Sequence, residues 1–129
     1  MLLRRISSRG GFWQGVTGGV EEGENLEEAA RRELFEEAGL LPIALERIDY
    51  SYSFPVEDKW RHIYEYGDDV EEIVAYVFLA YMDDKEPTID TREHERWKWC
   101  QFAEALKLLT WSGDIEALKR CDKALATHD

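Results

Sequence analysis

The sequence predicts one α+β domain in which a mixed β-sheet is sandwiched between α-helices. Its length of 129 residues suits one domain with its own core. The hydrophobic fraction of 44% and the charged fraction of 34% are typical of a globular protein. The predicted elements run in the order strands, helix, strands, helices, which favours a sheet covered on both faces. We therefore expect residues 1–129 to form a single domain.

Two strands are predicted before the first helix. Met1–Ser7 is a short apolar segment that carries two arginines, and Ser8–Gly11 has the composition of a turn. Phe12–Val20 follows as a second strand and leads into an acidic segment. The chain thus begins with two short strands joined by a turn.

The first helix is predicted over Leu26–Ala38. Asn25 followed three residues later by Glu28 is a capping-box-like start, with an N-cap side chain and an acid at the third helical position. Gly39 is placed to end the helix in a left-handed conformation. Both ends of this helix are therefore marked by local sequence.

Two acids fall on the apolar side of this helix. At 100° per residue, Leu26, Ala30 and Leu34 form one stripe, and Glu33 and Glu37 share that side. Carboxylates there would repel one another and lose hydration unless a cation sat among them. Several converging hard oxygen ligands suit Mg²⁺ or Mn²⁺. We therefore predict a metal site, with a merely acidic helix as the alternative.

The second half of the chain is predicted to contain strands followed by two helices. Pro42 ends the helical segment. The predicted strands are Ile43–Phe54, Lys59–Tyr66, Ile73–Met82 and Glu95–Phe102, and the predicted helices are Ala103–Leu109 and Ser112–Ala126. Because Ile73–Met82 is nearly all apolar, we expect a central strand buried on both faces. The last helix should direct Ile115, Leu118 and Leu125 inward.

The segment Lys59–Tyr66 would present two chemically different faces as a strand. Trp60 and His62 lie on the aromatic face, and Arg61 lies on the basic one. An aromatic face could stack a ring and a basic face could contact phosphates. Packing in the core of the sheet is the alternative for these aromatic residues, and for His62 in particular.

Composition excludes several classes of protein. A net charge of −12 argues against binding nucleic-acid polymers, which requires a basic face. The sequence has no apolar run that approaches the roughly 18 residues of a membrane span, and its first ten residues lack the apolar core of a signal peptide. A cytoplasmic protein without membrane partners is expected, with Cys100 and Cys121 as reduced thiols.

A motif at fixed spacing occupies Gly18–Leu40. It reads G-x(5)-E-x(7)-R-E-(apolar)-x-E-E-x-G-(apolar), and its fixed members are Gly18, Glu24, Arg32, Glu33, Leu34, Glu36, Glu37, Gly39 and Leu40. Ordinary residue frequencies make a random match on the order of one in 10 million per starting position. The segment resembles the signature of the Nudix hydrolases at every fixed position.

The resemblance implies a metal-dependent hydrolase that cleaves a phosphoanhydride bond in a nucleoside diphosphate linked to another group. It implies Glu36 and Glu37 as the core ligands of Mg²⁺ or Mn²⁺, and Glu33 as a third ligand or as the base that activates water. It further implies a backbone carbonyl ligand at Thr17 or Gly18.

Other positions of the motif are implied to support this site. Arg32 would orient the acids, and Glu24 would support the loop, as Gly18 and Gly39 support its turns. One more acid is expected from outside the motif, with Glu93 preferred by its context and Glu72 as the second choice. For Glu93 a solvated loop acid is an equally good explanation.

Segments outside the motif resemble one branch of the family. FWQGVTGGVEEGE, HERWKW and LLTWSGDIEAL look like the bacterial dihydroneopterin triphosphate and dATP pyrophosphohydrolases. That likeness implies the release of pyrophosphate from a nucleoside or pterin triphosphate. The candidates for contact with the substrate are Arg4, Arg5, Trp13, Gln14, Trp60 and Arg61. For Arg4 and Arg5, solvated charges at a strand end are an equally good explanation.

The sequence leaves two other functions open, and it departs from the family at its first strand. The chain could act on a dinucleoside polyphosphate or a nucleotide sugar, or it could be a regulatory module that binds a nucleotide without hydrolysing it. The family normally has another strand before Phe12, so either the true start lies upstream, the domain has lost a strand, or a neighbouring subunit covers the exposed edge. A sheet that lacks it would have an exposed edge, which makes a homodimer plausible.

Overall fold

The computed structural model describes residues 1–56 and 70–127. Its strands are β1 (Leu2–Arg5), β2 (Trp13–Gln14), β3 (Ala44–Pro55), β4 (Glu72–Tyr81) and β5 (His94–Lys98). Its helices are the 3₁₀ turn η1 (Ser7–Arg9), α1 (Leu26–Ala38), α3 (Phe102–Leu108) and α4 (Ser112–Ala126). The strand predicted over Lys59–Tyr66, with Trp60, Arg61 and His62, lies outside the described residues.

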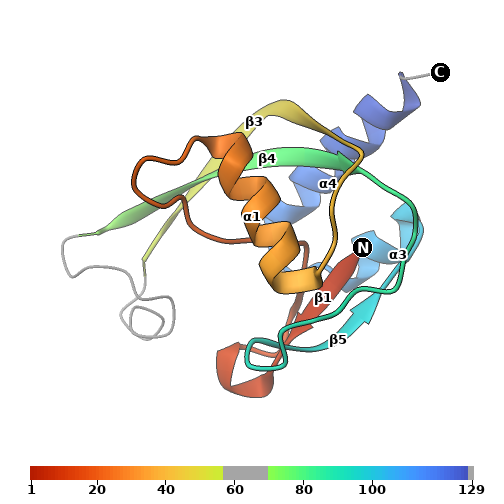
Figure 1. Cartoon of the computed structure of the whole chain (residues 1–129), viewed down its shortest axis with the longest axis horizontal. Helices are drawn as coiled ribbons and strands as arrows, with labels where there is room; N and C mark the ends of the chain where they lie inside the picture. The colour runs from red at the N-terminus through yellow and green to blue at the C-terminus, as the bar shows by residue number, and fades with distance from the viewer. Residues whose placement is uncertain (57–69, 128–129) are drawn as a thin grey trace.

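Strands β1, β2 and β5 form one sheet (Figure 1). Its order is β2-β1-β5, and Leu3 pairs with Gln14 on one side and with Trp97 on the other. Strand β1 therefore lies in the middle of this sheet, and β2 and β5 are its edges. The predicted strand Phe12–Val20 shortens to β2, and an irregular loop connects it to α1.

The other sheet is the antiparallel pair of β3 and β4. The expectation that β4 would be buried on both faces is wrong, because Val74 and Tyr76 are about half exposed. An apolar run indicates a strand, but it does not say how many layers will cover that strand.

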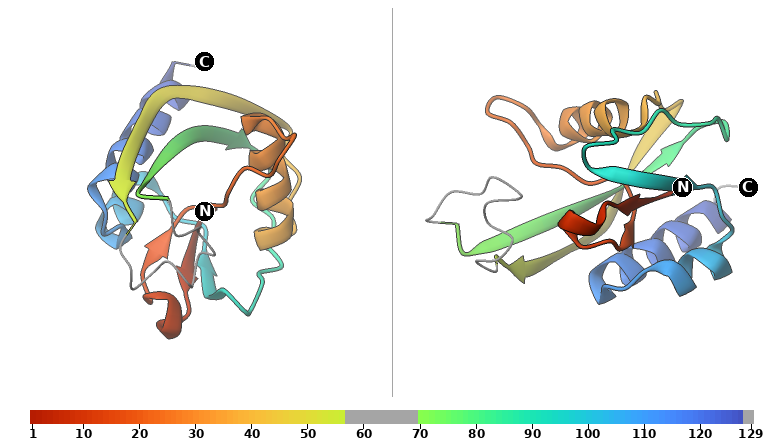
Figure 2. Two further views of the ribbon diagram at one scale, coloured as in Figure 1. Left: turned by 90° about the vertical axis from the view of Figure 1, so that its left-hand side faces the viewer. Right: turned by 90° about the horizontal axis from the view of Figure 1, so that it is seen from below.

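Helices cover opposite sides of these sheets, as the right-hand view of Figure 2 shows. On one side α1 packs Leu34 and Ala38 with Leu40 into a buried cluster that includes Ala80 of β4. On the other side α3 and α4 pack around a second cluster. The α+β sandwich predicted from the sequence is therefore confirmed.

The second cluster joins β1 to the C-terminal helices. Leu2, Ala105 and Leu109 form its buried centre, and Ile115 and Leu118 of α4 pack against it. The expectation for Leu125 is wrong, since half of its surface is exposed. The end of α4 projects away from the sheets, so its last turn has little to pack against (Figure 1). In the described part of the chain, no helix is long and apolar enough to cross a membrane.

Helix α1 has the bounds and both caps that the sequence predicts. The Asn25 side chain accepts a hydrogen bond from the Glu28 backbone N–H, and the Glu28 carboxylate accepts one from the Asn25 backbone N–H. Gly39 ends the helix with φ 66° and donates its N–H to the carbonyl oxygen of Phe35. Local interactions thus fix the helix that carries most of the acids of the motif.

Candidate functional site

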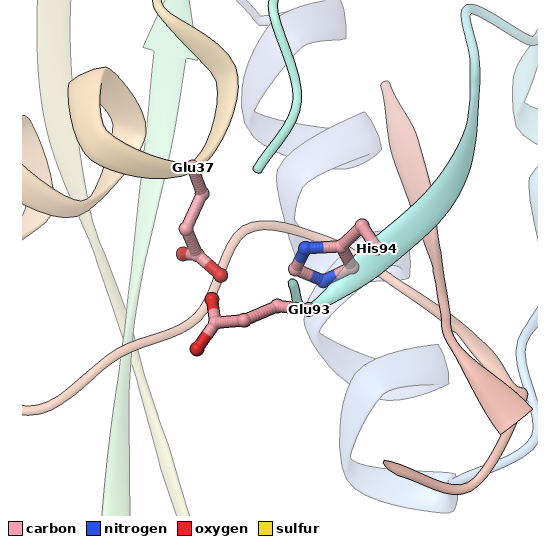
Figure 3. A group of neighbouring side chains, drawn as sticks. All are labelled: Glu37, Glu93 and His94. Atoms are coloured by element: carbon pink, nitrogen blue, oxygen red, sulfur yellow. The ribbon is translucent and has the colours of Figure 1, made fainter. Parts of the chain in front are cut away.

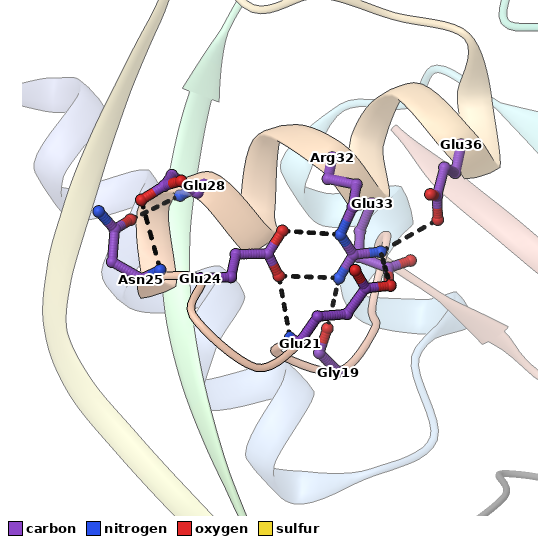
Figure 4. A network of polar contacts seen from close by, with 8 residues as sticks. All are labelled: Gly19, Glu21, Glu24, Asn25, Glu28, Arg32, Glu33 and Glu36. Atoms are coloured by element: carbon purple, nitrogen blue, oxygen red, sulfur yellow. Dashed lines mark hydrogen bonds and ion pairs between the residues drawn. The ribbon is translucent and has the colours of Figure 1, made fainter.

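Arg32 ties the acidic loop to helix α1 (Figure 4). Its guanidinium forms a two-pronged pair with Glu24, with Nε 2.8 Å from Oε2 and Nη2 3.0 Å from Oε1. Nη1 lies 2.8 Å from Oε1 of Glu33 and 3.1 Å from Oε2 of Glu36, and Nη2 donates to the Gly19 carbonyl at 2.6 Å. One internal cation therefore satisfies three acids of the motif and a loop carbonyl.

Glu37 lies on the opposite side of α1 from this network's exposed members. Only 4% of its surface is exposed, and no hydrogen-bond partner of its Oε2 atom is found in the described structure. Burial raises the pKa of Glu37 to about 9, and the negative charges of Glu33 and Glu93 add to that shift. Arg5 and the backbone of Thr17 oppose it. This carboxylate needs a further cation if it is to be charged at neutral pH.

Glu37, Glu93 and His94 form one group (Figure 3). A ligand atom from each lies within 4.8 Å of the others. His94 begins β5 and Glu93 directly precedes it, far along the chain from α1. Glu93 also pairs with Arg9 of η1 at 3.2 Å between Oε1 and Nη1. Of the two acids considered outside the motif, Glu93 reaches Glu37, whereas Glu72 is exposed at the start of β4.

Glu33 lies between the two groups and touches the backbone of the loop. A Cβ atom placed on Gly18 would lie 1.9 Å from Cδ of Glu33, so only glycine leaves room for this carboxylate. Burial raises the pKa of Glu33, and hydrogen bonding to Arg32 opposes the shift. The negative charge of Glu93 raises it further. Glu33 thus interacts both with the internal cation and with the buried acids.

His94 is a member of the site that the sequence analysis missed. Its side chain is fully buried, and burial with the positive charge of Arg5 lowers its pKa to about 4. Gln14 of β2 approaches the ring, with 3.4 Å between the two Nε2 atoms. The available signal was its position directly after Glu93, in a segment already chosen for an acid.

The described residues predicted to contact a substrate lie on the paired strands β1 and β2, where Arg4 is the register partner of Trp13. Arg4 forms an ion pair with Glu95. Arg5 is buried and donates from Nε to the carbonyl oxygen of Arg9 at 3.1 Å, so a solvated charge at a strand end is a wrong description of it. Trp13 packs against the core cluster around Leu2.

The donors gathered here fit a divalent metal ion. Glu37 and Glu93 supply carboxylate oxygens, and the Glu37 Oε2 atom is buried without a partner in the described structure. Glu33 is close enough for its charge to raise the pKa of Glu37, and the charge of Glu93 raises the pKa of Glu33. Carboxylate oxygens are the preferred ligands of Mg²⁺ and Mn²⁺.

The motif and this geometry agree with the comparison to known families. The NUDIX domain matches residues 1–121. The chain is a member of the Nudix family. Members of this family generally use a divalent metal ion.

Several relatives extend this finding. The chain is 35% identical to the dihydroneopterin triphosphate diphosphatase of Escherichia coli strain K12, over 87% of this chain and 75% of that protein. The solved structure of the E. coli dihydroneopterin triphosphate pyrophosphohydrolase aligns with a TM-score of 0.76 and 26% identity, covering 92% of this chain and 81% of that one. This Nudix chain therefore shares both sequence and fold with that enzyme.

Other relatives are longer than this chain. It is 34% identical to a Myxococcus xanthus protein named octanoyltransferase, over 93% of this chain and 31% of that protein. It is 33% identical to an RNA pyrophosphohydrolase of Caulobacter vibrioides, over 75% of this chain and 60% of that protein. The Nudix chain thus spans about a third of the first relative and 60% of the second.

Proposed function

We propose that this Nudix chain is a metal-dependent pyrophosphohydrolase that releases pyrophosphate from a nucleoside, deoxynucleoside or pterin triphosphate. The observation that carries the proposal is the buried Glu37 carboxylate, which lies beside Glu93 with one oxygen lacking a partner in the described structure. Such an arrangement is costly without a bound cation. The complete motif and the likeness to the E. coli enzyme support the same conclusion.

Glu37 and Glu93 are the proposed metal ligands, and Glu33 completes the set on the side of Arg32. Glu36, which is exposed and pairs with Arg32 at 3.1 Å in this structure, stays a proposed ligand as well. The Thr17 carbonyl remains a proposed further ligand. A bound Mg²⁺ or Mn²⁺ would neutralise phosphate charge and lower the pKa of a bound water.

Glu33 is proposed either as this third ligand or as the general base that activates water. A carboxyl group is a better base near neutral pH when its pKa is raised, and burial raises the pKa of Glu33. Arg32 holds this carboxylate at 2.8 Å, while Gly18 leaves the space that it occupies. The loop and the helix therefore position the base together.

The acidic charge of the motif also explains why metal is needed. Residues 21–37 contain eight acids and two arginines, a balance of −6. A triphosphate would be repelled by this segment unless bound cations reversed its sign. Arg4, Arg5 and Arg9 lie on β1 and η1 beside the site and are the proposed contacts for the remaining phosphate charge.

Product analysis tests the reaction. Purified protein is given Mg²⁺ with dihydroneopterin triphosphate, deoxynucleoside triphosphates, a dinucleoside polyphosphate or ADP-ribose, and pyrophosphate and orthophosphate are measured separately. We expect pyrophosphate from one triphosphate far above the other compounds. Products from only the dinucleotide or ADP-ribose would replace the proposed substrate class. Tight nucleotide binding without turnover would indicate a regulatory module instead.

A second candidate substrate is the triphosphate at the 5′ end of an RNA. It is favoured by the 33% identity to the Caulobacter enzyme. The net charge of −12 argues against contacts along an RNA backbone, so the absence of a polymer partner stays a prediction. Adding a short 5′-triphosphorylated RNA to the panel distinguishes the two, because we expect turnover of the free triphosphate to exceed that of the RNA.

A further inference from the structure

Three buried polar side chains meet beside the proposed metal site. Gln14 of β2, His94 of β5 and Glu37 of α1 have exposed fractions of 6%, 0% and 4%. Buried polar groups cost free energy unless they find hydrogen-bond partners. Yet neither His94 Nδ1 nor Glu37 Oε2 has a partner in the described structure, and the imidazole faces the carboxylates (Figure 3).

The contact between Gln14 and His94 couples the orientation of the Gln14 amide to the tautomer of the ring. The Gln14 Nε2 atom lies 3.4 Å from Nε2 of His94, and the donor in this contact depends on the tautomer. With the amide nitrogen toward the ring, Gln14 donates and Nε2 of a neutral His94 accepts. The proton of the ring is then on Nδ1, the nitrogen that has no partner in the described structure.

We propose that Gln14 and His94 form a relay that positions the Glu37 carboxylate for metal binding. In this relay Gln14 fixes the tautomer of His94, and the Nδ1–H of His94, which has no partner in the described structure, donates to Glu37 when the metal is bound. The relay rests on the proposed function, because it assumes that Glu37 binds the metal. Gln14 and His94 are positioning residues, since the metal would contact Glu37 and neither of these two side chains.

In a simpler alternative, His94 is itself a metal ligand. The two arrangements differ in which ring nitrogen carries the proton. Direct ligation needs a lone pair on Nδ1 and the proton on Nε2, which requires Gln14 to present its oxygen to the ring. In the relay the protonation is the reverse. Groups that orient a ligand in this way are worth about 10–100-fold in metal affinity.

The first experiment measures the tautomer directly. Protein labelled with ¹⁵N-histidine is studied by long-range ¹H–¹⁵N correlation NMR, with His62→Gln and His128→Gln variants used to assign the other two histidines. We expect His94 to carry its proton on Nδ1. A proton on Nε2 would overturn the relay whatever the activity of the enzyme.

The second experiment measures Mn²⁺ affinity from the electron paramagnetic resonance signal of free Mn²⁺. His94→Asn keeps an amide N–H near the place of Nδ1, whereas His94→Leu has a similar size without a donor. We expect about a 10–100-fold loss of affinity in the leucine variant and a much smaller loss in the asparagine variant. Equal losses in both, with unfolding curves that show both folded, would mean a packing role and overturn the relay.

A variant of Gln14 tests the first link without altering His94. Gln14→Glu keeps the shape of the side chain, but its carboxylate accepts a hydrogen bond from Nε2–H and so leaves the lone pair of Nδ1 facing Glu37. We expect the NMR tautomer to reverse and Mn²⁺ affinity to fall. A reversed tautomer with unchanged affinity would contradict the relay.

Pulsed electron paramagnetic resonance of the Mn²⁺ complex separates the remaining outcomes. We expect no directly coordinated nitrogen in the wild-type protein. A strong ¹⁴N coupling that disappears in His94→Leu would make His94 a ligand and overturn the relay. Failure of the wild-type protein to bind Mn²⁺ would overturn the relay together with the proposed function, whereas binding that is unaffected in the relay variants would overturn the relay alone.

Discussion

The acids of the motif divide into two groups whose negative charge is neutralised in different ways. Glu24, Glu33 and Glu36 surround Arg32, so a cation within the chain neutralises them. Glu37 lies beside Glu93, where burial and like charge raise its pKa to about 9. In the first group an internal cation orients the carboxylates, and the second group has the properties of a site for an external cation.

Removing the charge of Glu37 should have the largest effect. Glu37→Gln keeps the shape of the side chain but removes a proposed ligand, and we expect kcat/KM to fall by roughly 1,000-fold or more, about 4 kcal/mol in transition-state stabilisation. The matched control is Glu27→Gln on the same helix, whose carboxylate only pairs with the exposed Arg31. Wild-type rates in Glu37→Gln would sink the assignment of the metal site.

The same comparison predicts how Arg32 differs from a simple positive charge. Arg32→Lys retains the charge but loses the two-pronged contact with Glu24 and the bond to the Gly19 carbonyl. We expect about a 100-fold loss of kcat, because the base and the loop lose their orientation. Activity assays of Arg32→Lys and the wild-type protein at a saturating concentration of Mn²⁺ measure this loss of kcat. Full activity at high Mn²⁺ would mean that Arg32 acts only on metal affinity.

Glu37 and His94 should affect the free energy of unfolding in different ranges of pH. Without metal, the pKa of Glu37 rises from its unfolded value of 4.5 to about 9 in the folded protein, so its contribution to stability is present below pH 4.5 and is lost as the pH rises toward 9. The pKa of His94 falls from 6.5 to about 4, so its contribution is lost only as the pH falls below 6.5. Above pH 6.5 the Glu37 effect therefore acts without opposition from His94.

Chemical unfolding between pH 6.5 and 9 measures this effect. We expect the metal-free wild-type protein to lose on the order of 1 kcal/mol per pH unit relative to Glu37→Gln. Mn²⁺ should reverse the order of the two proteins, since it binds the folded wild type. Parallel pH profiles for the two proteins would show that Glu37 does not titrate as a buried carboxyl group.

The glycines of the motif offer a smaller and more local contrast. Gly18→Ala would displace the Glu33 carboxylate, the flexible end of a side chain, so we expect kcat to fall by about 10-fold with little loss of stability. Gly39→Ala would place a side chain at φ 66° and 3.2 Å from Thr88 Cβ, so we expect about 1 kcal/mol of destabilisation instead. Steady-state kinetics and thermal unfolding of both variants would separate the two roles, and the reverse pattern would contradict them.

The sequence by itself determined the helix and its anomaly. Asn25, Glu28 and Gly39 define the ends of α1 through interactions within a few residues, and those ends match the prediction. The helical period likewise placed Glu37 on the apolar side, where it is indeed buried. Both results depend on local geometry, which a sequence encodes directly.

Only the tertiary structure decided what faces Glu37. Glu93 and His94 reach it because β5 pairs with β1, and Gln14 reaches His94 because β2 pairs with the other edge of β1. These are long-range pairings, and no local pattern in the sequence specifies them. The same pairings buried Arg5 and placed β1 in the middle of its sheet. The sequence therefore identified an acid that needs a cation, and the packing of strands distant in sequence decided which side chains surround that acid.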